Sequence, residues 1–291
     1  MSYLQQAKKP KNEAPMITLV GSAGAGKTSL AGMFPNPIFI QAENAGTVFE
    51  NWADDVQPVM MPQLPDAKKD SAGNMAVSVR QTITDQLREL ATAQHDFKTV
   101  VIDTITALNV KFEHEIAQRD NVTNVGDACG GYHKGYTEIA QWHDQLISNC
   151  EKLKRLKGMT IVFLAHSGIE KIKNRPDESS EYAVYGLGMH RASAERYISN
   201  SDAVIYIKKE EFVTGAETNR KGQTTKYGRA MQTGERVLIT SGDGLIGYVA
   251  AKNRYGMPTE LPCELGTNPL LQYIKHFNNT AAAETKTNEV N

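Results

Sequence analysis

Glycines, a lysine and a hydroxyl residue stand at fixed spacing in GSAGAGKT, residues 21–28. Glycines allow consecutive backbone N–H groups to curl around an anion, and a lysine at this position reaches the outer phosphates of a nucleotide. The hydroxyl after the lysine is a ligand for Mg²⁺. The pattern predicts ATP and Mg²⁺ as cofactors. Lys27 would also act in catalysis and Thr28 on the metal, within a loop of Gly21, Ser22, Ala23, Gly24, Ala25, Gly26, Lys27, Thr28 and Ser29.

The flanking residues place this loop between a strand and a helix. MITLVG (16–21) predicts a short apolar strand, and TSLAGMF (28–34) predicts a short helix that ends before Pro35. The alternative is a chance glycine-rich turn. At average glycine usage a chance match in a chain this long has odds on the order of one per cent, so nucleotide binding is favoured.

Two carboxylates follow predicted strands. FKTVVIDTITAL (97–108) predicts a buried strand with Asp103, and a carboxylate at the carboxyl end of a parallel strand faces the ligand crevice. We expect Asp103 to hold Mg²⁺; the alternative is a helix cap. Thr104 comes next instead of a second carboxylate, so the base that orients the attacking water must lie elsewhere. Glu43, which ends PIFIQAE (37–43), is the candidate, and an exposed structural role is its alternative.

His166 ends a further predicted strand, MTIVFLAHS (159–167). At a strand end its side chain can hydrogen-bond the γ-phosphate and sense hydrolysis. A lone histidine beside an apolar strand is more often a satisfied core residue. Both interpretations stay open at this point.

Strands alternate with helices along the chain, and several strands are apolar on both faces. This predicts an α/β fold with a mostly parallel central sheet flanked by helices and a C-terminal hairpin extension. We expect a flexible N-terminal arm (1–14), one ATPase domain (15–277) and a disordered tail (278–291). The remaining predicted elements are helices at 76–93 and 136–156 and strands at 56–62, 202–209, 236–241 and 246–253.

Composition argues against several other classes. The net charge of −1 leaves no global basic field, so nucleic-acid binding must come from local patches. Three widely spaced cysteines argue against a disulfide framework or a zinc site. The polar first 15 residues and the lack of a long apolar run argue against a signal peptide and a membrane span. We expect a cytoplasmic protein, in the host cytoplasm if it is phage-encoded.

Together these motifs resemble the RecA-like ATPase core. The likeness rests on GSAGAGKT, Glu43 in FIQAEN, Asp103 in VVIDT and His166 in FLAHS. The most similar group is the single-domain, phage-borne RecA-fold proteins associated with single-strand annealing and recombination. The resemblance implies ATP bound between protomers of a homo-oligomer, either ring or filament. It also implies a single-stranded-DNA-binding protein as a further partner.

AKNRYGMP (251–258) carries two cations two residues apart, where side chains on a strand point the same way. It resembles the segment of RecA recombinases and DnaB-type helicases in which a basic pair enters the neighbouring subunit's ATP site. By this resemblance Lys252 and Arg254 are catalytic residues that act on a neighbour's γ-phosphate. The alternative is a surface salt-bridge pair.

The resemblance also implies that loops after the Asp103 and His166 strands face single-stranded DNA. The first (118–136) combines glycines with aromatic and basic residues, which suits base stacking and phosphate contact. The second (168–196) carries cations and five carboxylates, and a lid that touches no DNA is its alternative. The candidate DNA-binding residues are Tyr132, His133, Lys134, Tyr136, Lys171, Lys173, Arg175 and Arg191.

We therefore expect an ATPase that binds single-stranded DNA and acts in DNA recombination or strand annealing. A hexameric helicase-type translocase shares every ATP-site residue. A regulatory ATPase with protein partners and a small-molecule kinase are further alternatives, although a kinase leaves AKNRYGMP without a role. Salt-dependent binding to single-stranded DNA separates the DNA-directed hypotheses from these last two.

Overall fold

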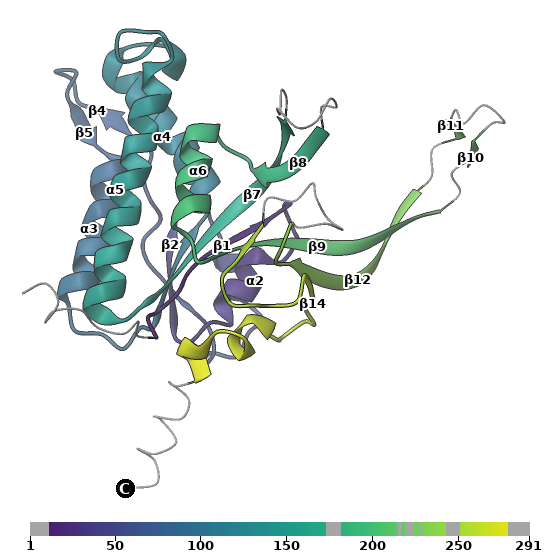
Figure 1. Ribbon diagram of the computed structural model, residues 1–291. Helices are drawn as coiled ribbons and strands as arrows, with labels where there is room; N and C mark the ends of the chain where they lie inside the picture. Colours follow the sequence, from purple (N-terminus) through teal and green to yellow (C-terminus); the bar gives the residue numbers. More distant parts are fainter. Residues whose placement is uncertain are drawn as a thin grey trace, which may run out of the picture.

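A central sheet with helices on both faces forms the body of the protein (Figure 1). The computed structural model describes residues 12–172, 182–214, 217–218, 224–226, 229–242 and 251–278. The strands of the main sheet follow the order β14–β12–β9–β1–β7–β6–β2–β3. The strands that pair in parallel are β1 (Met16–Gly21), β2 (Pro37–Gln41), β3 (Val59–Met60), β6 (Thr99–Asp103), β7 (Thr160–Ile172) and β9 (Ala203–Thr214).

Antiparallel strands extend this sheet beyond β9. β12 (Arg229–Ile239) pairs with β9 and with β14 (Glu260–Pro262), and β13 (Lys252–Asn253) pairs with the start of β9. β8 (Tyr182–Leu187) pairs with the end of β7. Two small hairpins are formed by β4 (Lys68–Lys69) with β5 (Met75–Val77) and by β10 (Glu217–Thr218) with β11 (Thr224–Lys226). The predicted α/β class, with its parallel sheet and C-terminal extension, is confirmed.

Helices cover the two faces unequally (Figure 1). One face carries α3, α4, α5 and α6, and the other carries α2 and the C-terminal segment. Among the described residues, no helix is long and apolar enough to cross a membrane. The α-helices are α2 (Lys27–Gly32), α3 (Val79–Thr92), α4 (Ile105–Asp120), α5 (Lys134–Lys157) and α6 (Arg191–Asn200). Single turns of 3₁₀-helix lie at η1 (Gly46–Phe49), η2 (Val125–Asp127) and η3 (Pro269–Gln272).

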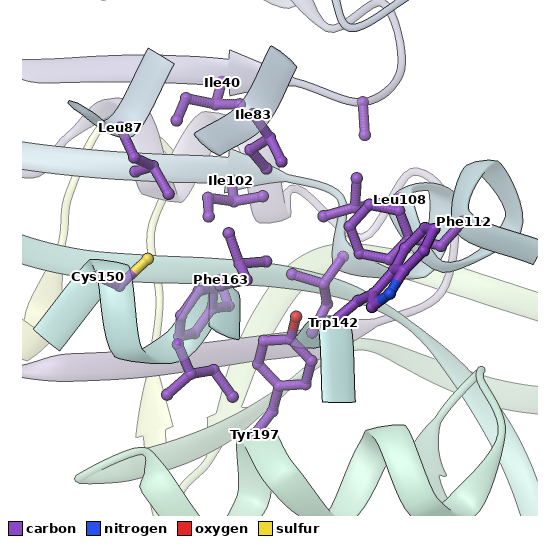
Figure 2. Close-up of a cluster of buried hydrophobic side chains, with 14 of the residues drawn as sticks. Ile40, Ile83, Leu87, Ile102, Leu108, Phe112, Trp142, Cys150, Phe163 and Tyr197 are labelled. Carbon is purple, nitrogen blue, oxygen red and sulfur yellow. The ribbon is translucent and has the colours of Figure 1, made fainter. Parts of the chain in front are cut away.

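The sheet divides the core into two layers. Alternate strand residues face opposite sides, so Val100 and Ile102 of β6 lie in one cluster and Val101 lies in the other. Figure 2 shows the first cluster, in which Leu87 of α3 and Phe112 of α4 pack against the sheet. Truncating a fully buried aromatic residue to alanine typically costs about 3–5 kcal/mol. This two-sided packing holds the carboxyl ends of the parallel strands in fixed positions.

Helix α4 corrects one predicted element. The sequence predicts a strand through residue 108, but β6 ends at Asp103 and α4 begins at Ile105. Thr104 caps this helix, and its hydroxyl accepts a hydrogen bond from the N–H of Ala107 at 3.2 Å. A continuous apolar run looks alike in a buried strand and in the buried first turn of a helix, which explains the error.

The segment after His166 is also more regular than the predicted loop 168–196. β7 continues to Ile172 and forms a hairpin with β8, and α6 follows. Lys173 and Arg175 lie outside the described residues, and the side chain of Lys171 is likewise not described. Residues 246–250 of one predicted strand and most of both predicted tails also fall outside them.

Candidate active site

The carboxyl ends of neighbouring parallel strands bring the predicted nucleotide-site residues to one edge of the sheet. Gly21 on β1 is in register with His166 on β7, and Gln41 on β2 is in register with Asp103 on β6. A cleft of about 320 Å³ lies at this edge. It is lined by Ala23, Gly24, Gly26, Lys27, Thr28, Ser29, Glu43, Val48, Asp103, Thr104 and His166.

The loop between β1 and α2 needs glycine for two different reasons. Gly26 has a φ of 92°, in the left-handed region that side-chain-bearing residues rarely adopt. At Gly21 a Cβ atom would lie 2.9 Å from the carbonyl oxygen of Ile207 on β9. The loop is therefore held tightly against the sheet, as the motif predicts for a phosphate cradle.

Lys27 is buried at the floor of this cleft. Its ammonium group donates hydrogen bonds to the carbonyl oxygens of Gly21 and Ser22, both at 3.0 Å. Burial lowers the pKa of Lys27, while the nearby carboxylates of Asp103 and Glu43 oppose that shift. An anionic ligand in the cleft would strengthen the charged form of this side chain.

Thr28 and Asp103 form the candidate metal pair. The Thr28 hydroxyl donates to Oδ2 of Asp103 at 2.9 Å, and Asp103 is almost fully buried. Burial raises the pKa of Asp103 to about 6, against the opposing effect of the Thr28 hydrogen bond. A buried carboxylate next to a hydroxyl fits Mg²⁺, which binds few protein oxygens and takes its other ligands from phosphates and water.

His166 lies between Glu43 and Lys27. Its Nε2 is 3.2 Å from Oε1 of Glu43, and its Nδ1 is 3.3 Å from Nζ of Lys27. The hydrogen bond with His166 is the main cause that holds the pKa of Glu43 below its usual value. The side chain of His166 is 37% exposed and borders the cleft, so His166 is not a core histidine. The lowered pKa favours the ionised form of Glu43 at this cleft.

Lys252 and Arg254 lie at the opposite edge of the sheet. Lys252 is in register with Val204 near the start of β9, whereas the phosphate loop follows the end of β1. Its ammonium group donates to the carbonyl oxygens of Ile198 at 3.1 Å and Ser199 at 2.8 Å. Arg254 forms a 3.0 Å ion pair with Asp202. Neither cation reaches the cleft of its own chain, and a role at a neighbour's site stays a prediction.

Aromatic side chains gather at the N-terminal ends of α5 and α6, and we define this aromatic patch as the exposed Tyr132, His133 and His190 with the half-buried Tyr136. Tyr132 is 92% exposed. The ring of Tyr136 stacks on His190 with centroids 4.4 Å apart and on His133 with centroids 6.0 Å apart. His190 escaped the sequence analysis, because it is far from the other three in the chain.

Three of the predicted loop residues belong to helices. Lys134 and Tyr136 lie in the first turn of α5, where the sequence predicts a loop through residue 136. Arg191 is the first residue of α6 and pairs with Glu195 at 2.8 Å and Glu170 at 3.7 Å. Arg191 is thus partly neutralised, which weakens it as a phosphate contact.

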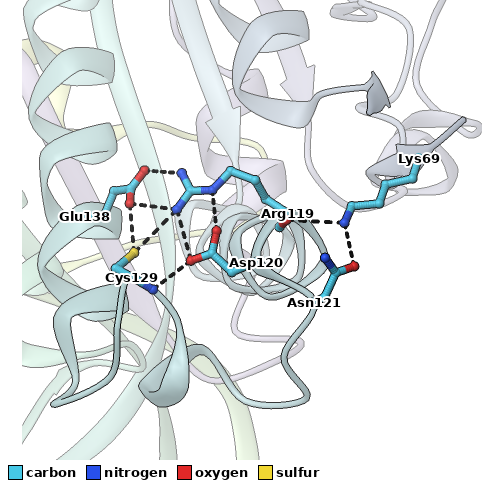
Figure 3. A network of polar contacts seen from close by, with 6 residues as sticks. All are labelled: Lys69, Arg119, Asp120, Asn121, Cys129 and Glu138. Carbon is cyan, nitrogen blue, oxygen red and sulfur yellow. Dashed lines mark hydrogen bonds and ion pairs between the residues drawn. The ribbon is translucent and has the colours of Figure 1, made fainter. Parts of the chain in front are cut away.

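A polar network fixes the base of the patch (Figure 3). Arg119 at the end of α4 bonds to both carboxylate oxygens of Glu138 on α5 and to Asp120. Asp120 accepts the backbone N–H of Cys129 at 2.6 Å, and the Cys129 thiol donates to Glu138 at 2.9 Å. These bonds connect the segment before Tyr132 to α4 and α5. They therefore fix the backbone from which the aromatic patch projects.

Comparison with protein families gives one match. A family model described as "AAA domain" matches residues 13–255, most of the chain. A search of curated proteins found no match. The match agrees with the cleft, because the glycine-rich loop, Lys27, Thr28 and Asp103 lie together there, as the motif predicts for a P-loop site. The chain belongs to the AAA domain family and is a nucleotide-binding P-loop ATPase of the AAA type.

Proposed function

We propose that this ATPase binds single-stranded DNA in an ATP-dependent manner and acts in DNA recombination or strand annealing. In this proposal MgATP lies between protomers of a ring or filament with RecA-like architecture. The observation that carries the proposal is a short bonded path from the nucleotide cleft to the aromatic patch.

The path starts at His166, whose side chain borders the cleft. Its backbone carbonyl accepts a hydrogen bond from the N–H of Gly188 at 2.7 Å. Two residues after Gly188, His190 stacks on Tyr136, and the exposed Tyr132 stands four residues before Tyr136 in the chain. A shift of His166 on hydrolysis therefore has a direct mechanical route to the patch. Such a route is what a DNA-linked ATPase requires.

At the nucleotide each residue has a separate task. Lys27 exchanges the carbonyl oxygens of its own loop for phosphate oxygens. Thr28 and Asp103 would hold Mg²⁺, which neutralises phosphate charge when it is bound. Glu43 orients the attacking water and accepts its proton, and His166 contacts both Glu43 and Lys27. This arrangement supports hydrolysis with His166 as the residue that senses it.

The patch suits unpaired bases. An exposed aromatic ring such as that of Tyr132 can stack on any base, and Lys134 follows it closely in the chain as an exposed cation. The chain as a whole carries a net charge of −1, so contacts of this local kind are needed to bind nucleic acid. A duplex would hide its base faces from the patch, which favours single strands.

Binding of a fluorescent oligothymidine in the presence of a non-hydrolysable ATP analogue tests the proposal. Losing a stacked aromatic costs about 1–3 kcal/mol. Tyr132→Ala and the Tyr132→Ala, Tyr136→Ala double variant should therefore weaken DNA binding stepwise. Leu156→Ala is the control, because Leu156 is a large exposed apolar residue near the far end of α5. Unchanged affinity in the double variant would remove the patch from the DNA path.

A further inference from the structure

Two cations outside the predicted site lie against the phosphate loop. Lys209 on β9 and Arg236 on β12 are directly opposite each other in the antiparallel register of these strands. The ammonium group of Lys209 is 4.0 Å from the Cβ position of Gly24. A Cβ atom on Gly26 would collide with Nη1 of Arg236. Both side chains therefore point to the glycine-rich part of the loop.

Among the residues that the structure describes, no carboxylate pairs with either of these cations. Arg236 is only 6% exposed, and its Nε and Nη2 atoms have no hydrogen-bond partner. Within the described residues neither Arg236 nor Lys209 takes part in an ion pair. Like charges directly opposite on paired strands repel each other, and a buried charge without a partner is costly. An anion that joined this pair would offset both costs.

The sheet order indicates which part of a ligand this anion is. β7 and β6, with His166 and Asp103, lie on one side of β1, and β9 and β12 lie on the other. The metal-binding end of a phosphate chain belongs on the Asp103 side. The opposite end, next to the sugar, then points toward β9, and neighbouring strands are only about 4.8 Å apart.

Resting on the proposed ATP site, we infer that Lys209 binds the nucleotide phosphates nearest the sugar, while Arg236 supports the loop from behind at Gly26. Lys209 is the group that touches the ligand. Arg236 acts through the loop as a positioning residue, and its charge is compensated only when the nucleotide is bound. The ligand-free protein is therefore less stable than it would be without this buried charge.

Titrations with MgATP and MgADP test the role of Lys209. Charge-assisted hydrogen bonds are the strong ones, so Lys209→Met should weaken both nucleotides about tenfold and by the same factor. Lys208→Met is the control, because Lys208 is exposed and its side chain points to the other face of the strand. Wild-type affinity in Lys209→Met, or a loss confined to ATP, would overturn the inference.

Arg236→Met separates the positioning role from a structural one. Because it removes an unpaired buried charge and keeps much of the volume, its melting temperature without nucleotide should equal or exceed that of the wild type. The stabilisation by MgATP should fall, and Arg236→Lys should restore part of it. A lower melting temperature with unchanged nucleotide affinity would overturn this role. If the wild type does not bind ATP, the proposed function fails together with this inference. If only the variants behave otherwise than expected, the inference fails and the proposed function stands.

Discussion

Cations lie near both ends of the neighbouring parallel strands β1 and β9, and their surroundings differ. At the carboxyl end Lys27 is buried in a cleft with Glu43 and Asp103 close enough to affect its pKa. At the amino end Lys252 contacts helix carbonyls, and Arg254 pairs with Asp202 on the surface. The first arrangement gathers charges that a ligand can rearrange, whereas the second already satisfies its charges within the chain.

This difference has a consequence for the proposed assembly. The side chain of Arg254 is 57% exposed, and exposed ion pairs contribute about 0–1 kcal/mol. A neighbouring γ-phosphate would therefore compete easily with Asp202 for Arg254. If no neighbour docks there, the amino end is only a structural contact. In the proposed assembly the amino end of one chain would thus complete the cleft at the carboxyl end of its neighbour.

The largest effect is expected at the carboxyl end. Lys27→Ala removes the cation that would contact the outer phosphates, so ATP hydrolysis should fall below detection in a phosphate-release assay. Its melting temperature without nucleotide should stay close to that of the wild type, because the lost hydrogen bonds are to loop carbonyls. Turnover at the wild-type rate in a folded Lys27→Ala protein would show that the cleft is assigned wrongly.

The amino end is tested by Arg254→Ala. A cation supplied from a neighbouring subunit typically contributes about 10³–10⁵ in rate, so the variant alone should be nearly inactive. Mixed with Lys27→Ala, it should regain partial ATPase activity, because some interfaces then pair an intact loop with an intact Arg254.

Two results would show that Arg254 only forms a surface ion pair with Asp202 and has no role at a neighbour's site. One is a mixture that stays inactive although co-assembly is demonstrated by size. The other is a dilute wild-type monomer that hydrolyses ATP at the full rate. In either case Arg254→Ala should alter only stability, by about 1 kcal/mol or less.

A smaller effect is expected within the cleft from Glu43→Gln. This change keeps the shape and the contact with His166 but removes the base, so turnover should fall roughly a hundredfold while ATP affinity is retained. Glu50→Gln, at an exposed position shortly after Glu43 in the chain, is the matched control. Equal losses of binding and turnover in Glu43→Gln would indicate a structural role for this carboxylate.

The local sequence pattern was sufficient to predict much of the fold and most residues of the cleft. GSAGAGKT between an apolar strand and a helix predicts the phosphate loop, because its glycines and Lys27 are consecutive in the chain. The predicted strand ends also brought Asp103, Glu43 and His166 to one cleft, although β7 continues past His166 and only its parallel pairing with β1 ends there. Periodicity failed where strand and helix look alike, as at Ile105, which begins α4.

Contacts between distant segments were decided only by the tertiary structure. The placing of His166 between Glu43 and Lys27 depends on the order of strands, which apolar runs do not encode. Arg236 follows Gly26 by more than 200 residues in the chain, and its approach to that glycine depends on the register of β12 with β9. Residue type and short-range spacing thus specify which chemistry is available. Packing of the sheet decides which charged groups meet, because only burial makes an unpaired charge costly enough to require a ligand.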